Sequence, residues 1–313
     1  MHKSPLSSLR ILSLLVLGMV CLGLKSSPAQ EQDGVTLETI LESSRKYETK
    51  YDQILKNHIA TLHSEAAEED PDDPDNVTKL HDWSMEIIKT ELHFRARSLS
   101  DLQPRGNKPP EQKQMVLARN PVYALWIEGP IRDDLMPLYQ VKRIEHPPGR
   151  GLLWLEKTLT DNLKKCGATT LPMTDLPSLL SHPNFSTVAI HTKGDIVELI
   201  FEFEQEDDDQ KFSGLTGGTL YFIPIEGYWC LKRARLQTTF SDKPCRMIIE
   251  NRLATADGFA VPFVRKSTVL YRGVSMNGWE IHALELEPKP QEISFEEFFL
   301  TSYGLEEPEF DDD

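Results

Sequence analysis

The chain has 313 residues, of which 39% are hydrophobic and 27% are charged, and its formal net charge is −15. These proportions are ordinary for a soluble globular protein, and they exclude collagen-like, coiled-coil and wholly disordered chains. The excess of acidic side chains argues against a nucleic-acid partner, whose phosphates would be repelled over most of the surface. It argues equally against electrostatic docking on anionic lipid.

The N-terminal residues are typical of an export signal. Lys3 and Arg10 precede an uncharged apolar segment, Ile11–Leu24, and Ser27-Pro28-Ala29 supplies small residues for cleavage. This apolar segment is shorter than the about 20 residues that span a membrane. We therefore expect residues 1–29 to be a signal peptide, with an uncleaved anchor as the alternative. The exported chain is then a periplasmic or extracellular protein of a bacterial cell envelope, with no stable membrane span after cleavage.

Three cysteines remain after cleavage, which is an odd number for an oxidising compartment. Cys166, Cys230 and Cys245 can form at most one disulfide within the chain. A tight turn near 241–244 would place Cys230 opposite about residue 254, which disfavours a bridge to Cys245. The chain has no C-x-x-C motif, so neither a zinc ribbon nor a thioredoxin-like site is indicated.

Residues 35–63 carry the clearest helical pattern in the chain. Thr36 is a suitable N-cap, and Glu38 in the first turn is favoured by the helix dipole. We expect the helix to end in the acidic and proline-rich segment 65–76, which reads as a solvated loop. The apolar positions that recur at three- and four-residue steps are Leu37, Ile40, Leu41, Tyr47, Tyr51, Ile54, Leu55, Ile59 and Leu62.

From about residue 82 the pattern changes to that of β-strands, except for 157–184, where a short helical insert is expected. The apolar phase shifts within 82–98, which indicates a bulge or two strands. The candidate strands are 82–98, 112–128 (broken at Asn120-Pro121), 138–145, 151–156, 186–192, 196–205, 218–225, 228–240, 246–255, 259–272 and 278–287. The last seven follow one another through short turns, so they must be antiparallel neighbours.

Together these elements predict an α+β fold: a curved antiparallel β-sheet, or half-barrel, with a long N-terminal helix packed in its concave face and a short helical insert. We expect a single domain over 30–308. The acidic loop 65–76 and the insert 157–184 belong to this domain. Residues 309–313 read as an acidic tail.

The order of helix, β-meander, short insert and second β-meander resembles the LolA-like half-barrels, the class of periplasmic lipoprotein carriers. The closer similarity, to an uncharacterised exported bacterial branch, lies in Gly218–Phe222, Gly227–Trp229, Asp257–Pro262, Trp279–Leu284 and Phe298–Pro308. In the first half, Gln114–Leu125 and Gly151–Leu155 resemble a second exported family. The resemblance implies a half-barrel whose groove binds a hydrophobic molecule, a lipid or a lipidated partner.

No motif indicates catalysis, a cofactor or a metal. The acidic run Glu202–Asp209 lacks the spacing of a calcium loop and is more typical of a solvated hairpin tip. The histidines form no H-x-x-H, H-E-x-x-H or H-x-H pattern, and the chain has no G-x-S-x-G elbow. We therefore predict no catalytic residue, no cofactor and no metal ligand.

Five aromatic side chains are the candidates for lining a ligand groove: Trp126, Trp154, Phe222, Trp229 and Trp279. The alternative is that they only fill the space between sheet and helix, which is the commoner role. We expect an exported envelope protein that binds a hydrophobic small molecule, a lipid or a lipoprotein. A non-catalytic scaffold or interaction protein and an exported carboxylate-dependent hydrolase are the alternatives.

Overall fold

The computed structural model describes residues 34–70, 73, 75–102, 111–130, 139–172, 174–204, 212, 214–240, 243–273, 277–290 and 293–310. From Thr36 onward the chain forms one compact unit. The predicted signal peptide 1–29, the end of the acidic tail and most of the acidic run Glu202–Asp209 lie outside the described residues.

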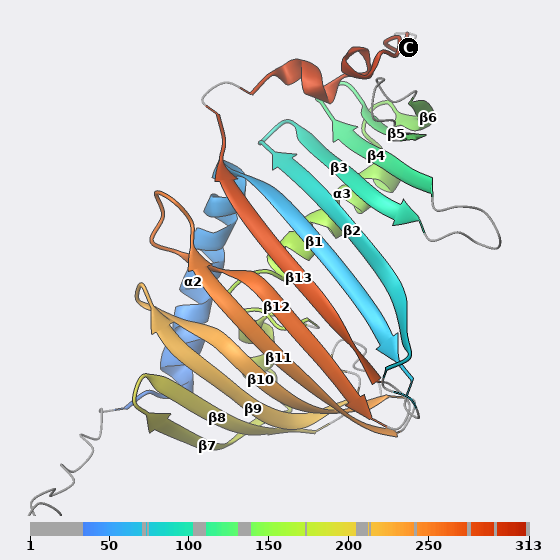
Figure 1. Cartoon of the computed structure of the whole chain (residues 1–313). Helices are drawn as coiled ribbons and strands as arrows, with labels where there is room; N and C mark the ends of the chain where they lie inside the picture. The colour runs from blue at the N-terminus through green and yellow to red at the C-terminus, as the bar shows by residue number, and fades with distance from the viewer. Residues whose placement is uncertain are drawn as a thin grey trace, which may run out of the picture. The chain divides into compact units, whose positions relative to one another are not determined.

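The described strands form one antiparallel sheet of thirteen strands (Figure 1). Their order across the sheet is β6-β5-β4-β3-β2-β1-β13-β12-β11-β10-β9-β8-β7, so two meanders join where β1 pairs with β13. The strands are β1 (His58–Glu69), β2 (Val77–Lys89), β3 (Phe94–Leu102), β4 (Glu111–Arg119), β5 (Ala124–Pro130), β6 (Gln140–Glu145), β7 (Phe185–Lys193), β8 (Ile196–Phe203), β9 (Leu215–Ile225), β10 (Tyr228–Phe240), β11 (Lys243–Thr255), β12 (Pro262–Gly273) and β13 (Asn277–Pro288). The sheet is curved and unclosed, with β6 and β7 at its edges, which confirms the predicted half-barrel.

Helix α2 (Leu37–Asn57) begins with a capping box in which Thr36 and Thr39 bond each other's backbone. The predicted helix 35–63 was too long, and the predicted loop 65–76 began too early, because His58–Glu69 form β1. In this strand burial alternates, with Ala60 and Leu62 buried. The apolar residues of this segment fit both the alternation of a strand and the apolar face of a helix. The segment forms a strand because it pairs with β2 and β13.

The helical insert begins earlier than predicted. Residues 151–156, expected to be a strand, belong to α3 (Arg150–Lys164), and α4 (Leu176–Leu180) follows. Leu152, Leu159 and Leu163 recur at helical spacing and bury one face of α3 against the sheet. The apolar run therefore marks a buried helical face and not a strand.

The other strand predictions are confirmed to within a few residues. Residues 82–98 divide between β2 and β3, and 112–128 divide between β4 and β5 at Asn120. The seven C-terminal candidates correspond to β7–β13. Cys166, Cys230 and Cys245, the cysteines that the structure describes, are free and buried, so they form no disulfide with one another.

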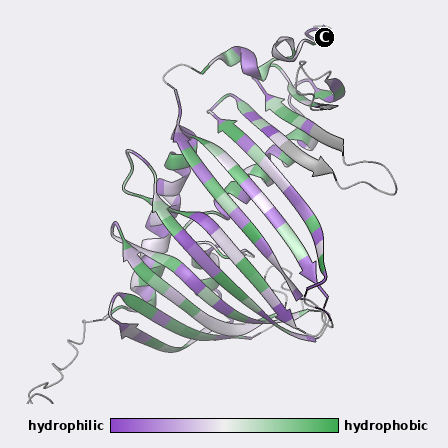
Figure 2. Ribbon diagram, in the orientation of Figure 1, coloured by the Kyte–Doolittle hydropathy of each residue, from purple (hydrophilic) through white to green (hydrophobic). Residues whose placement is uncertain are grey.

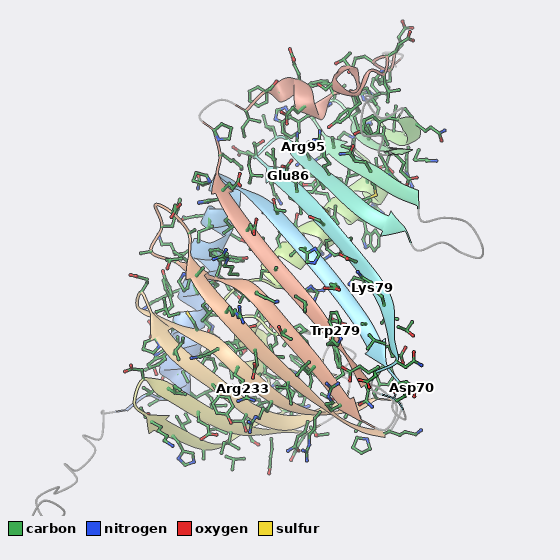
Figure 3. The ribbon with its side chains drawn as sticks, in the orientation of Figure 1. Asp70, Lys79, Glu86, Arg95, Arg233 and Trp279 are labelled. Carbon is green, nitrogen blue, oxygen red and sulfur yellow. The ribbon has the colours of Figure 1, made fainter. Side chains whose placement is uncertain are left out.

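Helices α2 and α3 pack on the concave face of the sheet, and their buried side chains form one cluster with those of β1, β2 and β13. The strands show the alternation of apolar and polar residues that a sheet with one covered face requires (Figure 2). Figure 3 shows the opposite, convex face, on which Lys79, Arg233 and Trp279 lie.

The C-terminal segment covers part of the convex face. Its 3₁₀ turns, Phe295–Phe298 and Leu300–Tyr303, pack on β4 and β5 through a second buried cluster. Arg95 of β3 is buried and ion-paired with both Glu86 and Glu297, which fastens this segment to the sheet. Near β4 and β5 both faces of the sheet are thus covered.

Candidate functional site

A pocket of about 490 Å³ opens between α2, the C-terminal end of α3 and the segment 169–175. Its volume lies in the range of small-molecule sites. It is lined by Tyr47, Glu48, Tyr51, Asp52, Asp161, Lys164, Lys165, Thr169, Thr170, Leu171, Pro172, Thr174 and Asp175. Three stretches that are distant in sequence therefore meet here.

The floor of the pocket is built from two tyrosines of α2. Tyr47 and Tyr51 are one helical turn apart, and their rings stack with centroids 5.5 Å apart. The Tyr47 hydroxyl donates to the Pro262 carbonyl at 2.6 Å and accepts from the Ala168 N–H at 2.8 Å. The Tyr51 hydroxyl donates to the Leu163 carbonyl at 3.0 Å. Burial raises the pKa of both phenols well above 10, so the floor is neutral and held by hydrogen bonds.

The rim of the pocket is acidic. Glu48 and Asp52 repeat the same one-turn spacing on α2, while Asp161 comes from α3 and Asp175 from the N-cap of α4. Desolvation raises the pKa of Glu48, and the negative charge of Asp175 raises it further. Lys164 lies 3.9 Å from an Asp52 carboxylate oxygen and offsets part of this charge.

One wall of the pocket is the segment 169–175, which is held by a hydrogen-bonded turn. Leu171 and Thr174 exchange backbone hydrogen bonds, with N···O distances of 2.8 and 3.2 Å. Thr170 and Asp175 pair as an isolated β-bridge, and an Asp175 carboxylate oxygen accepts the Ser178 N–H at 2.6 Å. Leu171 and its neighbour Pro172 add apolar surface. The wall is therefore ordered by its own hydrogen bonds.

This arrangement suits a ligand with an apolar part and a positively charged polar part. Tyrosine rings and aliphatic groups form the floor and one wall, and four carboxylates outnumber two lysines around them. Among the described residues, no group of three or more histidine, cysteine, aspartate or glutamate side chains is placed to hold a metal ion.

None of the five aromatic residues predicted to line a groove lines this pocket. Trp126 packs against the core cluster beneath α3, Phe222 is fully buried in β9, and Trp154 of α3 is 67% exposed. The backbone N–H of Trp229 donates to the hydroxyl of Ser43 on α2 at 2.9 Å, and the Trp229 side chain is partly buried. Trp279 lies five positions from the buried Leu284 in β13 and so points to the convex face.

The sequence contains one local signal of this pocket. Tyr47 with Glu48, and Tyr51 with Asp52, repeat an aromatic–acid pair at one-turn spacing on α2. The contributions of Asp161 and Asp175 could not be found in this way, because only the fold brings them to α2.

A second polar cluster lies on the helix-covered face of the sheet. The Ser64 hydroxyl is 3.0 Å from His81 Nε2, and His282 Nε2 is 3.3 Å from a Glu280 carboxylate oxygen. Register places Ser64 directly opposite His282 on β13. Ser64 is only 1% exposed, however, so the serine is inaccessible to a substrate in this structure.

The fold and the pocket define an α+β half-barrel with a pocket beside its helices. Within the described ranges, no helix is long and apolar enough to cross a membrane.

No protein-family model matches the chain, and no curated protein matches it in sequence. Among solved structures, a DUF1329 family protein from Desulfovibrio piger is similar with 8% sequence identity and a TM-score of 0.38. The match covers 84% of this chain and 99% of that one. A likeness of this degree carries no information about function.

Proposed function

We propose that this chain is an exported binding protein of the bacterial cell envelope, related to the LolA-like half-barrels, which holds an amphipathic, lipid-like ligand. The observation that carries the proposal is the pocket of about 490 Å³, in which an aromatic floor meets a rim of carboxylates. The predicted export signal supports the compartment, and the resemblance seen in the sequence supports the ligand class.

In the proposed complex the apolar part of the ligand lies against the half-buried Pro172, above the floor of Tyr47 and Tyr51, which is itself almost wholly buried. These groups are already ordered, so binding costs little conformational entropy in the protein. A cationic group of the ligand, such as an amine, meets Glu48 and Asp52 on the rim. An uncharged or anionic ligand of the same size would leave this rim uncompensated and bind more weakly.

Native mass spectrometry tests the proposal directly. Residues 30–313, which include the whole compact unit, are purified without detergent from the envelope fraction of their own cells. We expect a lipid-like adduct that disappears on denaturation. A clean apo mass, under conditions that retain the adduct of a known carrier, would refute ligand binding and favour the scaffold.

A pair of variants then locates the ligand. Asp52→Trp places an indole over the pocket and is expected to abolish the adduct. Gln53→Trp introduces the same side chain at the next, exposed position of α2 and should retain it. Retention of the adduct in both variants would place the ligand elsewhere and overturn the assignment of this pocket.

A second candidate, carboxylate-dependent hydrolysis, is favoured by one observation. Desolvation raises the pKa of Glu48, which favours its protonated form, and a protonated carboxyl group beside three further carboxylates could act as a general acid. We propose testing turnover of the identified adduct by Glu48→Gln against Glu42→Gln, an exposed glutamate on the same helix. Turnover that is lost only in Glu48→Gln would support the hydrolase.

A further inference from the structure

The outer face of α3 presents apolar side chains to solvent. Trp154 is 67% exposed and Leu153 is 40% exposed, next to each other on the helix. The opposite face of the helix is already buried through Leu152, Leu159 and Leu163. Helix α3 therefore already has a face buried in the core, and Trp154 lies on its solvent-facing side.

Cations flank these apolar side chains. Arg150, Trp154, Lys157, Asp161 and Lys164 follow at steps of four, three, four and three residues, so they form one stripe along the helix. The stripe has three cations and one acid, in a chain whose net charge is −15. We call these five residues and Leu153 the α3 stripe.

The first two cations of the stripe are available to a partner. Within the described part of the chain, Arg150 and Lys157 form no ion pair. The nearby Glu145 is already engaged, because it accepts the Leu152 N–H at 3.1 Å and lies 2.5 Å from Arg143. Glu145 therefore does not pair with Arg150, and the charge of Arg150 stays available at the N-terminal end of α3.

We infer that the α3 stripe docks on a lipid bilayer that carries anionic headgroups. Tryptophan prefers the interface between water and acyl chains, and Leu153 adds apolar area beside it. Arg150 and Lys157 lie where they would meet the lipid phosphates. The end of the same helix lines the pocket through Asp161, Lys164 and Lys165, so docking would bring the pocket close to a membrane.

Co-sedimentation with vesicles tests the inference on residues 30–313. The vesicles are phosphatidylcholine with or without phosphatidylglycerol. We expect binding to require phosphatidylglycerol and to weaken about tenfold in Trp154→Ala. The double variant Arg150→Gln/Lys157→Gln should weaken it about thirtyfold. Added salt should reduce binding of the parent chain but have little further effect on the double variant.

Matched variants exclude unspecific effects. Phe295→Ala removes an aromatic ring that is 57% exposed from the C-terminal segment, and Arg246→Gln/Arg252→Gln removes two exposed cations from the convex face. Both should bind vesicles like the parent chain. Equal losses in these controls, or parent binding that is absent or indifferent to Trp154→Ala, would overturn the inference.

The docking surface and the ligand pocket can fail independently. Asp52→Trp, which fills the pocket, should still bind vesicles, because it removes only the partner of Lys164 and leaves Arg150, Trp154 and Lys157 unchanged. If vesicle binding survives while no adduct is ever found, the inference stands without the proposed function.

Discussion

Replacing Tyr47 by phenylalanine tests whether the pocket floor is fixed by its hydrogen bonds. Phenylalanine keeps the ring and leaves no cavity, so the change isolates the hydroxyl. In the structure that hydroxyl serves both the Pro262 carbonyl and the Ala168 N–H, and Tyr47 is only 1% exposed. An unpaired buried polar group costs about 1–3 kcal/mol. With two such groups we expect Tyr47→Phe to lower the free energy of unfolding by about 3 kcal/mol.

Tyr51→Phe is the matched control, because it removes one hydroxyl from the same floor. Its acceptor, the Leu163 carbonyl, keeps a hydrogen bond from the Cys166 N–H at 3.0 Å, so no group is left unpaired. We expect a loss of only about 1 kcal/mol. Both values come from urea unfolding followed by circular dichroism, with an unchanged dependence on urea concentration. An equal or larger loss in Tyr51→Phe would refute the reasoning.

Three further predictions concern stability and reactivity. Asn120→Ala should cost about 3 kcal/mol, since the buried Asn120 side chain bonds the Phe298 carbonyl and two backbone N–H groups; urea unfolding measures it. Burial lowers the pKa of Lys289 to about 8, so from that pH to 10.5 the unfolded chain binds more protons at this site, and Lys289 contributes a rise of the free energy of unfolding with pH. Lys289→Met should remove this contribution, so that the free energy of unfolding of the variant increases less, or falls more, with pH than that of the parent chain; identical pH dependences would contradict the prediction. Burial raises the pKa of the Cys166 and Cys230 thiols to about 12, so an alkylating reagent should modify them only after unfolding, as read by mass.

Most of the sheet could be predicted from the sequence because its turns are explicit. Links such as 226–227 and 257–258 contain glycines at positive φ, which fix hairpin ends independently of the rest of the chain. The helix 35–63 was predicted too long and 151–156 was wrongly predicted as a strand. In both places the apolar residues fit a helical period of 3.6 residues and a strand period of two. His58–Leu62 continues the stripe of α2, and Gly151–Leu155 is a short apolar run of the kind found in buried strands. Only the neighbours in the fold, β2 and β13 for one and the sheet beneath α3 for the other, decide between helix and strand.

The candidate site was harder to predict than the fold, for a physical reason. Aromatic residues were the obvious candidates, but a tryptophan in a strand points to one of two faces, and Trp126 and Trp279 point to opposite ones. The pocket instead depends on where α3 ends relative to α2 and on the turn at 171–174. Such long-range placement leaves no local pattern in the sequence.

The net charge of the whole chain does not describe the charge of each part of its surface. A total of −15 argued against anionic lipid, but screening at physiological salt limits the range of exposed charges to about 8 Å. The α3 stripe from Arg150 to Lys164 extends about 21 Å along the helix. A bilayer in contact with Trp154 would sense mainly Arg150 and Lys157, because Lys164 lies about 15 Å further along the helix and is offset by Asp52. Many of the acids in the total belong to segments of other elements, such as 65–76 and 202–209. The total charge therefore predicts how the protein behaves at long range and low salt, while docking depends on the charges within one screening length of Trp154.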